Sequence, residues 1–542
     1  MLPGSGAGWQ LAAMLIAAGA LLPVVVLAGF AAQGSIGLWP HLLRNVLANA
    51  LGQTAILLAG VGVIVAVIGT VTAWLIAGFD FPGRRILGWA LALPLAVPTY
   101  IVAYAYLDIL HPVGPVQSLL RDLLGYSSPR EFRLPDIRSV WGCVLLLGFV
   151  LYPYVYLPVR ALFATQAANL LEASRTLGAG PARVFWRVVL PLARPAIAVG
   201  MALALMEALN DIGAAEFLGV RTLTVSVYAT WINRGDLPGA AQIAIVMLLI
   251  VVSLVLVERR ARRGQRYAGG AHRLLPLSRT RLRGASAVFA ALVCALPVLV
   301  GFAAPAAYLA HQAWRRVVHA GIPPRIWVEA GQTAALALVA TLVAVGLGLV
   351  ISAAPRLRPS PATRAAARIS TLGYAVPGTI LAIGLLPVIT FADRQISGVL
   401  GWFMTNAPQL LLLGSGAALI HAYVTRFLAI GTGGIEAGMT RIPLSFDHAA
   451  RSMGQSPTGV FRRIHLPLTR ASMAAAGLLI FVDCVKELPA TLLLRPLNVE
   501  TLATHLYGEA ARGTYEDGSI AALLIVVIGM LPVALLSRGI RA

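Results

Sequence analysis

Twelve long apolar runs, separated by polar or basic stretches, constrain this 542-residue chain more than any other feature. Hydrophobic residues make up 58% of the chain and charged residues only 12%, a composition that a soluble core does not require. An apolar run of about 20 residues crosses a bilayer as a helix. The sequence therefore predicts an all-α polytopic membrane protein with about 12 transmembrane helices, over the runs 11–32, 51–76, 86–110, 141–164, 195–218, 240–257, 287–309, 334–351, 369–389, 410–428, 471–494 and 520–536.

The arginines of the chain gather mainly in every second loop between these runs. If the N-terminus is cytoplasmic, the inside loops hold Arg84 and Arg85, the basic stretch 259–285 and the basic stretch 441–470. The positive-inside rule then predicts that both termini lie in the cytoplasm. This topology and contact with membrane lipid account for the net charge of +21, so no nucleic-acid partner is expected.

Two dipeptides recur at a spacing of 279 positions along the chain. They are Gln53-Thr54, repeated as Gln332-Thr333, and Val97-Pro98, repeated as Val376-Pro377. Each half holds six runs, an even number, so we expect two parallel six-helix repeats related by an axis along the membrane normal. The predicted organisation is a first repeat at 1–258, a basic cytoplasmic linker at 259–285 and a second repeat at 286–542.

A motif in the loop after the fourth run occurs again after the tenth. Its first copy, in loop 165–194, consists of Glu172, Ala173, Ser174, Gly178, Leu190 and Pro191, and its second copy, in loop 429–470, of Asp447, His448, Ala449, Ala450, Gly454, Ile464, Leu466 and Pro467. Alanine favours a slim helix, glycine permits a sharp turn, and the proline starts a new element. In the second copy His448 stands where an acid is expected, which leaves the acidic contact of that copy open although Asp447 precedes it.

The two motif copies resemble the cytoplasmic loop of ABC importer permeases, and the stretch VKELPATLLLRPLNVETLA resembles the ferric-iron permeases of that group. The resemblance covers nearly the whole chain and implies the type I permease fold in the bacterial inner membrane. It implies that each loop helix docks in a groove of an ATPase subunit, giving two copies of a cytoplasmic ABC ATPase and a periplasmic substrate-binding protein as partners. The implied cargo is ferric iron, with thiamine or 2-aminoethylphosphonate as the alternatives. A plain amphipathic surface helix is the alternative for the loops.

The sequence contains no nucleotide-binding motif. A P-loop needs a glycine-rich turn followed by lysine and then serine or threonine, yet the only lysine, Lys486, is followed by Glu487. We therefore expect a non-catalytic permease that binds no cofactor of its own, with ATP-Mg used by the partner ATPase.

Ionisable residues interrupt the fifth and eleventh runs at matching positions. They are Glu207, Asn210 and Asp211 in the first repeat and Asp483, Lys486 and Glu487 in the second. Ionisable groups at membrane depth are costly, so they are expected to face the interior of the bundle or water. Two interpretations stay open. The acids line the path of a cationic cargo, or Lys486 pairs with an acid and the set holds helices together.

A proton-coupled secondary transporter with twelve spans is the alternative of another class. The stretch 78–85 is faintly similar to a short loop of that group, but a glycine expected four residues before Asp80 is Ile76. An ABC permease works with a separate ATPase and a binding protein, whereas a secondary transporter needs neither, so the two classes are easily distinguished.

Overall fold

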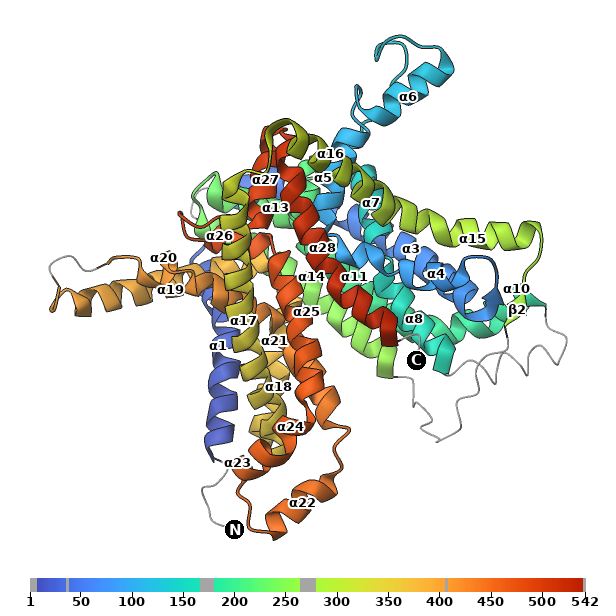
Figure 1. Cartoon of the computed structure of the whole chain (residues 1–542). Coiled ribbons are helices and arrows are strands. Elements are labelled where there is room, and N and C mark those ends of the chain that lie inside the picture. The colour runs from blue at the N-terminus through green and yellow to red at the C-terminus, as the bar shows by residue number, and fades with distance from the viewer. Residues whose placement is uncertain (1–6, 36–38, 166–179, 264–278, 405–407, 540–542) are drawn as a thin grey trace. The chain divides into compact units, whose positions relative to one another are not determined.

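The computed structural model describes residues 7–35, 39–165, 180–263, 279–404 and 408–539, almost all of them in helices (Figure 1). Among these residues ten helices are long and apolar enough to cross a membrane, and up to twelve spans result when each of two bent helix pairs counts as one. The described part of the chain has only two short strands, β1 (Phe79–Asp80) and β2 (Thr280–Arg281), which pair in parallel. The predicted all-α polytopic fold is confirmed.

The helices follow the apolar runs because a backbone in lipid must satisfy its hydrogen bonds within its own segment. Up to residue 263 they are α1 (Ala7–Gln33), α2 (Trp39–His41), η1 (Leu42–Leu47), α3 (Ala48–Gly78), α4 (Arg84–Ala90), η2 (Leu93–Ala96), α5 (Thr99–Ile109), α6 (Pro115–Leu124), α7 (Val140–Leu151), α8 (Pro153–Thr165), α10 (Pro181–Val184), η3 (Phe185–Val189), α11 (Leu190–Asn210), α12 (Gly213–Phe217), α13 (Leu223–Ile232) and α14 (Leu237–Arg263).

After the stretch 264–278, which lies outside the described residues and includes most of the predicted linker, the helices continue to the end of the chain. They are α15 (Ala285–Val298), η4 (Leu299–Ala303), α16 (Ala304–Ala320), α17 (Pro324–Leu357), α18 (Pro361–Ser370), η5 (Leu372–Ala375), α19 (Gly378–Leu400), α20 (Leu411–Gly414), α21 (Ala417–Met439), α22 (Leu444–Ser452), α23 (Pro457–Val460), η6 (Phe461–His465), α24 (Leu466–Leu468), α25 (Arg470–Val485), α26 (Pro489–Leu494), α27 (Leu502–Arg512) and α28 (Tyr515–Gly539).

Two pairs of helices are bent, one inside a predicted run and the other just before a predicted run. The run 86–110 divides into Arg84–Ala96 and Thr99–Ile109, whose axes differ by 94°. Pro98 lies at this break. The helix does not continue through it because proline lacks an N–H and disfavours a helical conformation in the residue before it. Near the run 471–494, Pro457–Leu468 and Arg470–Val485 meet at 71°.

The chain forms two compact units, and neither is a continuous half of the sequence. Unit 1 consists of Met1–Pro40, Val227–Leu248 and Pro323–His505, and unit 2 of His41–Ser226, Leu249–Ile322 and Leu506–Ala542. The first helix of the chain thus belongs to the unit that holds most of the second repeat. The first helices after the linker belong to the unit that holds most of the first.

Unit 1 is built around α17, the longest helix of the described residues. It packs against α1, α18, α21 and α25, and α1 also packs against α19. A buried apolar cluster joins the last turns of α17, represented by Ala353 and Leu357, to Ala450 of α22 and Val460 of α23. The short helices α22, α23 and α24 therefore gather at one end of α17 (Figure 1).

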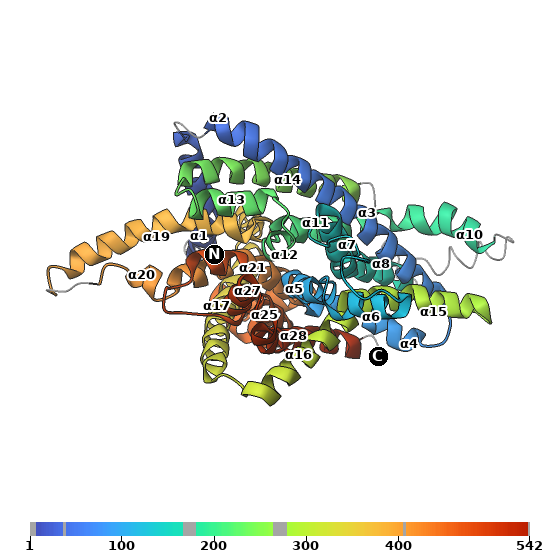
Figure 2. The ribbon, with the colours of Figure 1, turned by 90° about the horizontal axis from the view of Figure 1, so that it is seen from above.

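Unit 2 is built around α3, which packs against α7, α8 and α11 (Figure 2). In the same unit α16 packs against α5 and α28. The pairing of β1 with β2 places the end of the predicted linker beside the turn that follows α3.

Candidate functional site

The first motif copy lies mostly outside the described residues. Glu172, Ala173, Ser174 and Gly178 fall in the stretch 166–179. Leu190 and Pro191 are the first residues of α11, which continues directly from the π-helical η3. The role predicted for this loop therefore remains a prediction.

The second motif copy consists of a helix, a tight turn and a further helical segment. The four residues 447–450 lie in α22, and Gly454 follows with φ at +80°. A side chain at this backbone angle would be strained, so glycine ends the helix there. Ile464 lies in η6, and Leu466 and Pro467 lie in α24. The chain thus has a helix and a turn where the motif predicts them.

The helix α22 has an inward and an outward face. Ala450 is buried against α17, whereas His448 and Ala449 are exposed. Three apolar side chains on α22 and its turn are also exposed, namely Leu444 (61%), Phe446 (48%) and Met453 (74%). Apolar side chains left exposed together in a polar loop are typical of a surface that binds another protein. These apolar residues stand among arginines in the sequence. That pattern was visible in the sequence, but it is not part of the motif.

Asp447 faces inward and connects α22 to two other elements. Nε of Arg356, in the last turn of α17, lies 2.7 Å from Oδ2 of Asp447, and Nη2 donates to Oδ1 at 3.2 Å. Nε2 of His465, in η6, lies 2.9 Å from the same Oδ1. Such paired hydrogen bonds fix both distance and orientation. We call these three residues the Arg356–Asp447–His465 hub.

Arg356 also binds the connection that leads into α22. It donates to the carbonyl oxygens of Met439 at 2.6 Å, Ile442 at 2.9 Å and Pro443 at 3.4 Å. Burial by itself would raise the pKa of the Asp447 carboxyl, but the hydrogen bonds from Arg356 and His465 outweigh it and hold that pKa below its ordinary value. Asp447 is therefore an anion that positions α22 from its buried face. The exposed face of α22 carries the next residue, His448.

Asp211 and Glu487 occupy matching positions, 276 residues apart, at the breaks of two helices. After α11 ends at Asn210, Oδ1 of Asp211 accepts a hydrogen bond from the backbone N–H of Ala214 at 2.7 Å. After α25 ends, Oε1 of Glu487 accepts one from Ala490 at 3.0 Å. Each carboxylate thus caps the short helix that follows, where free N–H groups favour an anion. The helices over the runs 195–218 and 471–494 are therefore each interrupted at these acids.

The two breaks differ in what else holds the acid. In the first repeat the hydroxyl of Thr99 donates to Asp211. In the second repeat the matching position is Gly378, and Nη1 of Arg426 lies 3.0 Å from Oε1 of Glu487, with both side chains buried. A Cβ at Gly378 would lie 2.6 Å from that oxygen, so the glycine leaves room for the ion pair.

Glu207 and Asp483 also match each other and are half-buried. Nζ of Lys486 lies 2.7 Å from Oδ1 of Asp483, three residues earlier in the chain. Lys486 is thus paired with an acid close to it in the chain, and that this set holds helices together stays a prediction. Asn210, at the position that matches Lys486, is buried. That Glu207 and Asp483 line a pathway stays a prediction.

The recurring Gln-Thr dipeptide makes the same contacts in both repeats. Oε1 of Gln53 accepts from the N–H of Arg221 at 2.7 Å, and Oγ1 of Thr54 accepts from Leu223 at 3.0 Å. In the second repeat Gln332 accepts from Glu500 at 3.1 Å, and Thr333 from Leu502 at 2.9 Å. Within each unit the dipeptide therefore ties a long helix to the chain that follows a broken helix.

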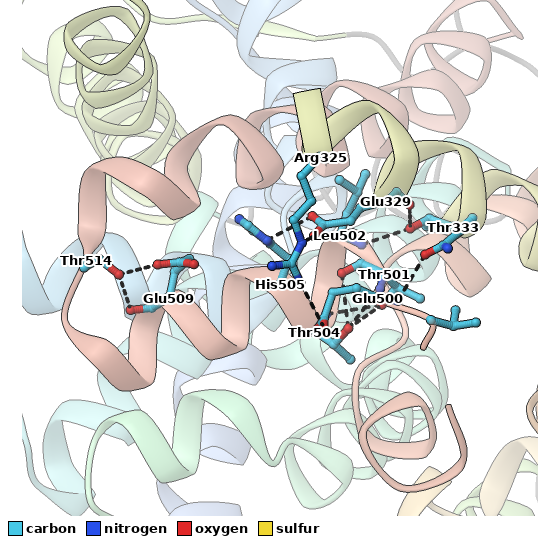
Figure 3. A network of polar contacts seen from close by, with 12 residues as sticks. Arg325, Glu329, Thr333, Glu500, Thr501, Leu502, Thr504, His505, Glu509 and Thr514 are labelled. Atoms are coloured by element: carbon cyan, nitrogen blue, oxygen red, sulfur yellow. Dashed lines mark hydrogen bonds and ion pairs between the residues drawn. The ribbon is translucent and has the colours of Figure 1, made fainter. Parts of the chain in front are cut away.

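In the second repeat charged side chains surround this contact (Figure 3). Glu329, whose side chain is 2% exposed, lies between Nε of Arg325 at 2.7 Å and Nδ1 of His505 at 2.9 Å. Nη2 of Arg325 also lies 3.7 Å from Oε2 of Glu500, which Arg495 approaches to 3.0 Å. We call Arg325, Glu329, His505 and Glu500 the Glu329 cluster. Sequence reasoning missed it, although a lone acid near an apolar run was a visible signal.

Within the ranges that the structure describes, no group of three or more His, Cys, Asp or Glu side chains is placed to hold a metal ion. The acids of the broken helices are instead engaged with backbone N–H groups, Arg426 and Lys486.

Comparison with known proteins gives matches over one repeat and over the whole chain. The family described as "Binding-protein-dependent transport system inner membrane component" matches residues 66–266. The Fe(3+)-transport system permease protein FbpB 2 of Haemophilus influenzae is 24% identical over 504 residues, covering 92% of this chain and 91% of that protein. The molybdenum transport system permease ModB of Escherichia coli is 32% identical over 208 residues, 37% of this chain and 87% of ModB. A putative 2-aminoethylphosphonate transport system permease, PhnU of Salmonella typhimurium, is 29% identical over 197 residues, 36% of this chain and 68% of PhnU.

Proposed function

The chain belongs to the family of binding-protein-dependent transport system inner membrane components, and from that premise we propose that it is the channel of an importer for ferric iron. It is an ABC importer permease embedded in the membrane by multiple spans. The proposal concerns its cargo, its partners and its orientation.

The extent of the similarity supports iron as the cargo. The similarity to the iron(III) permease extends over 504 residues and includes both repeats, whereas the similarities to the molybdenum and 2-aminoethylphosphonate permeases cover 37% and 36% of the chain. A fused pair of repeats is thus shared with the iron permease. Thiamine and 2-aminoethylphosphonate are the alternative cargoes.

The outward face of α22 supports an ATPase as the partner of loop 429–470. A docking partner would cover the exposed apolar side chains of α22, while the hub holds this helix in place through its buried face. By the sequence repeat, loop 165–194 would bind a second copy of the same ATPase. Both loops and both termini would then be cytoplasmic, and a periplasmic protein would deliver the cargo from the other side. ATP-Mg would be bound and hydrolysed by the ATPases, with no cofactor on this chain.

The broken helices narrow the set of residues that could meet the cargo. Asp211 and Glu487 cap the short helices that follow them, whereas Glu207 and Asp483 are half-buried, with Asp483 paired to Lys486. A carboxylate attracts a metal cation and repels an oxyanion such as molybdate, so these acids agree better with a cationic cargo.

Purification with the ATPase and the binding protein encoded beside this chain tests the proposal. We expect the permease to co-purify with two ATPase copies, and ATP hydrolysis in vesicles to rise when the binding protein carries ferric iron. Binding proteins loaded with thiamine, 2-aminoethylphosphonate or molybdate serve as the comparison. If one of these binding proteins raised ATP hydrolysis and the iron-loaded one did not, its ligand would be the cargo instead of iron. Uptake without any ATPase would favour a proton-coupled transporter.

A further inference from the structure

We propose that α17 is a stiff rod that couples α22 to residues 500–505, the stretch that follows the second broken helix, and that Asp447 and Glu329 are the positioning residues at its two ends. This inference rests on the proposed function, because it takes α22 to be the helix that an ATPase moves.

The Leu357 end of α17 is joined to α22 by polar and apolar contacts together. Arg356 binds Asp447 with two of its nitrogen atoms and reaches three backbone carbonyls before α22. The side chains of Arg356, Asp447 and His465 are 13%, 5% and 0% exposed, so water does not compete for these bonds. Leu357 and Ala450 pack in the same apolar cluster. A displacement of α22 is therefore passed to α17 rather than absorbed between them.

The Pro324 end of α17 is joined to the stretch 500–505 in the same way. Gln332 and Thr333 accept hydrogen bonds from the backbone N–H groups of Glu500 and Leu502. One turn earlier Glu329 pairs with His505 (Figure 3). Two hydrogen bonds and two contacts between charged or ionisable groups thus join one face of α17 to this stretch, counting the 3.7 Å approach of Arg325 to Glu500.

The helix between these ends is continuous. It runs for 34 residues, which at 1.5 Å per residue makes it about 50 Å long. It crosses α21 and α25 with buried alanines such as Ala340 and Ala344. Its backbone hydrogen bonds resist stretching, so displacement passes along its axis. The one N–H missing inside the helix, at Pro355, lies at the hub end, where Arg356 joins α17 to α22.

Neither charged set recurs in the sequence at the matching positions of the first repeat. At the positions that match the hub, Arg356, Asp447 and His465, the first repeat has Ala77, Leu171 and Val189. At those that match Arg325, Glu329 and His505 it has Val46, Ala50 and Ser226. At the Pro324 end of α17 the Gln-Thr contact, by contrast, is present in both repeats. The charges therefore serve a task particular to the second repeat, and they lie at the two ends of one helix.

Asp447→Asn, Glu329→Gln and the double variant test the rod in the complete transporter with its ATPase and binding protein in vesicles. We expect each single change to lower cargo-stimulated ATP hydrolysis about tenfold and the double variant to be no worse, since residues that act through one element are not additive. Co-purification with the ATPase and hydrolysis without cargo should not change in Glu329→Gln, which lies outside the docking loop. Arg358→Gln is the matched control, because Arg358 lies just beyond the hub and contacts Gln10 instead of α22.

Two outcomes would overturn the rod. One is a hundredfold or so loss in the double variant, which would mean that the two ends act independently. The other is loss of ATPase binding in Asp447→Asn, which would make Asp447 a contact residue. If Asp447→Asn does not fold, the combined change Arg356→Ala, Asp447→Leu and His465→Val gives the second repeat the residues of the first and leaves no buried charge. Full stimulation in that variant would also overturn the rod. Failure of the unsubstituted permease to bind any ATPase would instead refute the proposed function.

Discussion

The hydroxyl oxygen of Thr54 accepts a hydrogen bond from the backbone N–H of Leu223, 3.0 Å away. The same bond occurs between Thr333 and Leu502 at 2.9 Å. In each repeat the two partners are 169 residues apart in sequence. The Gln-Thr dipeptide, which recurs in the sequence, thus makes the same contact in both repeats. In each repeat this contact holds the stretch of chain that follows a broken helix.

Replacing either threonine by valine should weaken the protein by a similar amount. Valine has the shape of threonine but no acceptor, so Thr54→Val and Thr333→Val each leave a buried N–H without a bond, at a cost of about 1–3 kcal/mol. Thermal unfolding of the detergent-solubilised permease measures the change. Thr54→Ser and Thr333→Ser keep the acceptor and should stay near the original midpoint. A large loss at one site alone would show that the two contacts are not equivalent.

Neutralising the two capping acids should have unequal effects. Asp211→Asn keeps an oxygen that can accept from Ala214, so we expect it to cost less than about 1 kcal/mol. Glu487→Gln removes the charge that faces buried Arg426, and breaking such a pair costs about 3–5 kcal/mol. Membrane levels and thermal midpoints of the two variants test the difference. Equal midpoints would mean that the Arg426 pair contributes little.

A side chain at Gly454 should disturb the turn after α22 without creating a clash. No atom lies within 4 Å of a Cβ built there, but the φ of +80° costs a non-glycine residue about 1–3 kcal/mol. Gly454→Ala should lower uptake and ATPase association while the permease remains in the membrane, and Gly454→Pro should abolish uptake. Gly433→Ala is the control, since Gly433 has equal space in a regular helix. Normal uptake in Gly454→Pro would count against a docking role for this loop.

Variants of the half-buried acids Glu207 and Asp483 can distinguish the two interpretations of the ionisable residues in the broken helices. If they meet a cationic cargo, Glu207→Gln combined with Asp483→Asn should reduce its uptake several-fold with little change in stability, because a partly exposed pair such as Asp483 with Lys486 contributes only about 0–1 kcal/mol. Uptake of iron into vesicles and the thermal midpoint are measured together. Unchanged uptake would leave these acids with a structural role only.

Much of this structure could be predicted from local patterns. Twelve apolar runs predicted the spans, and paired dipeptides predicted the repeat, in which Thr54 and Thr333 make matching contacts. The bend after Val97-Pro98 was also visible as a proline in the run. Such features depend on residues close together in the chain, where composition and spacing decide the outcome.

The partners of the charged side chains could not be predicted in the same way. Arg356 and Asp447 are 91 residues apart, and Glu329 and His505 are farther apart still. Asp447 looked like part of an outward docking motif, but its place on the inward face of α22 sends it to α17. Likewise Glu487 looked like a pathway acid, and the break of its helix makes it a cap.

The sequence by itself determined that this chain fills a membrane with two similar sets of helices, because hydropathy and the hydrogen-bonding needs of a backbone in lipid act over a single helix. Only the tertiary structure decided which charged side chains contact one another and which helices belong to which compact unit. It also decided that one long helix carries polar contacts at both of its ends. Those outcomes depend on pairs of residues brought together from distant parts of the chain, and no local preference encodes them.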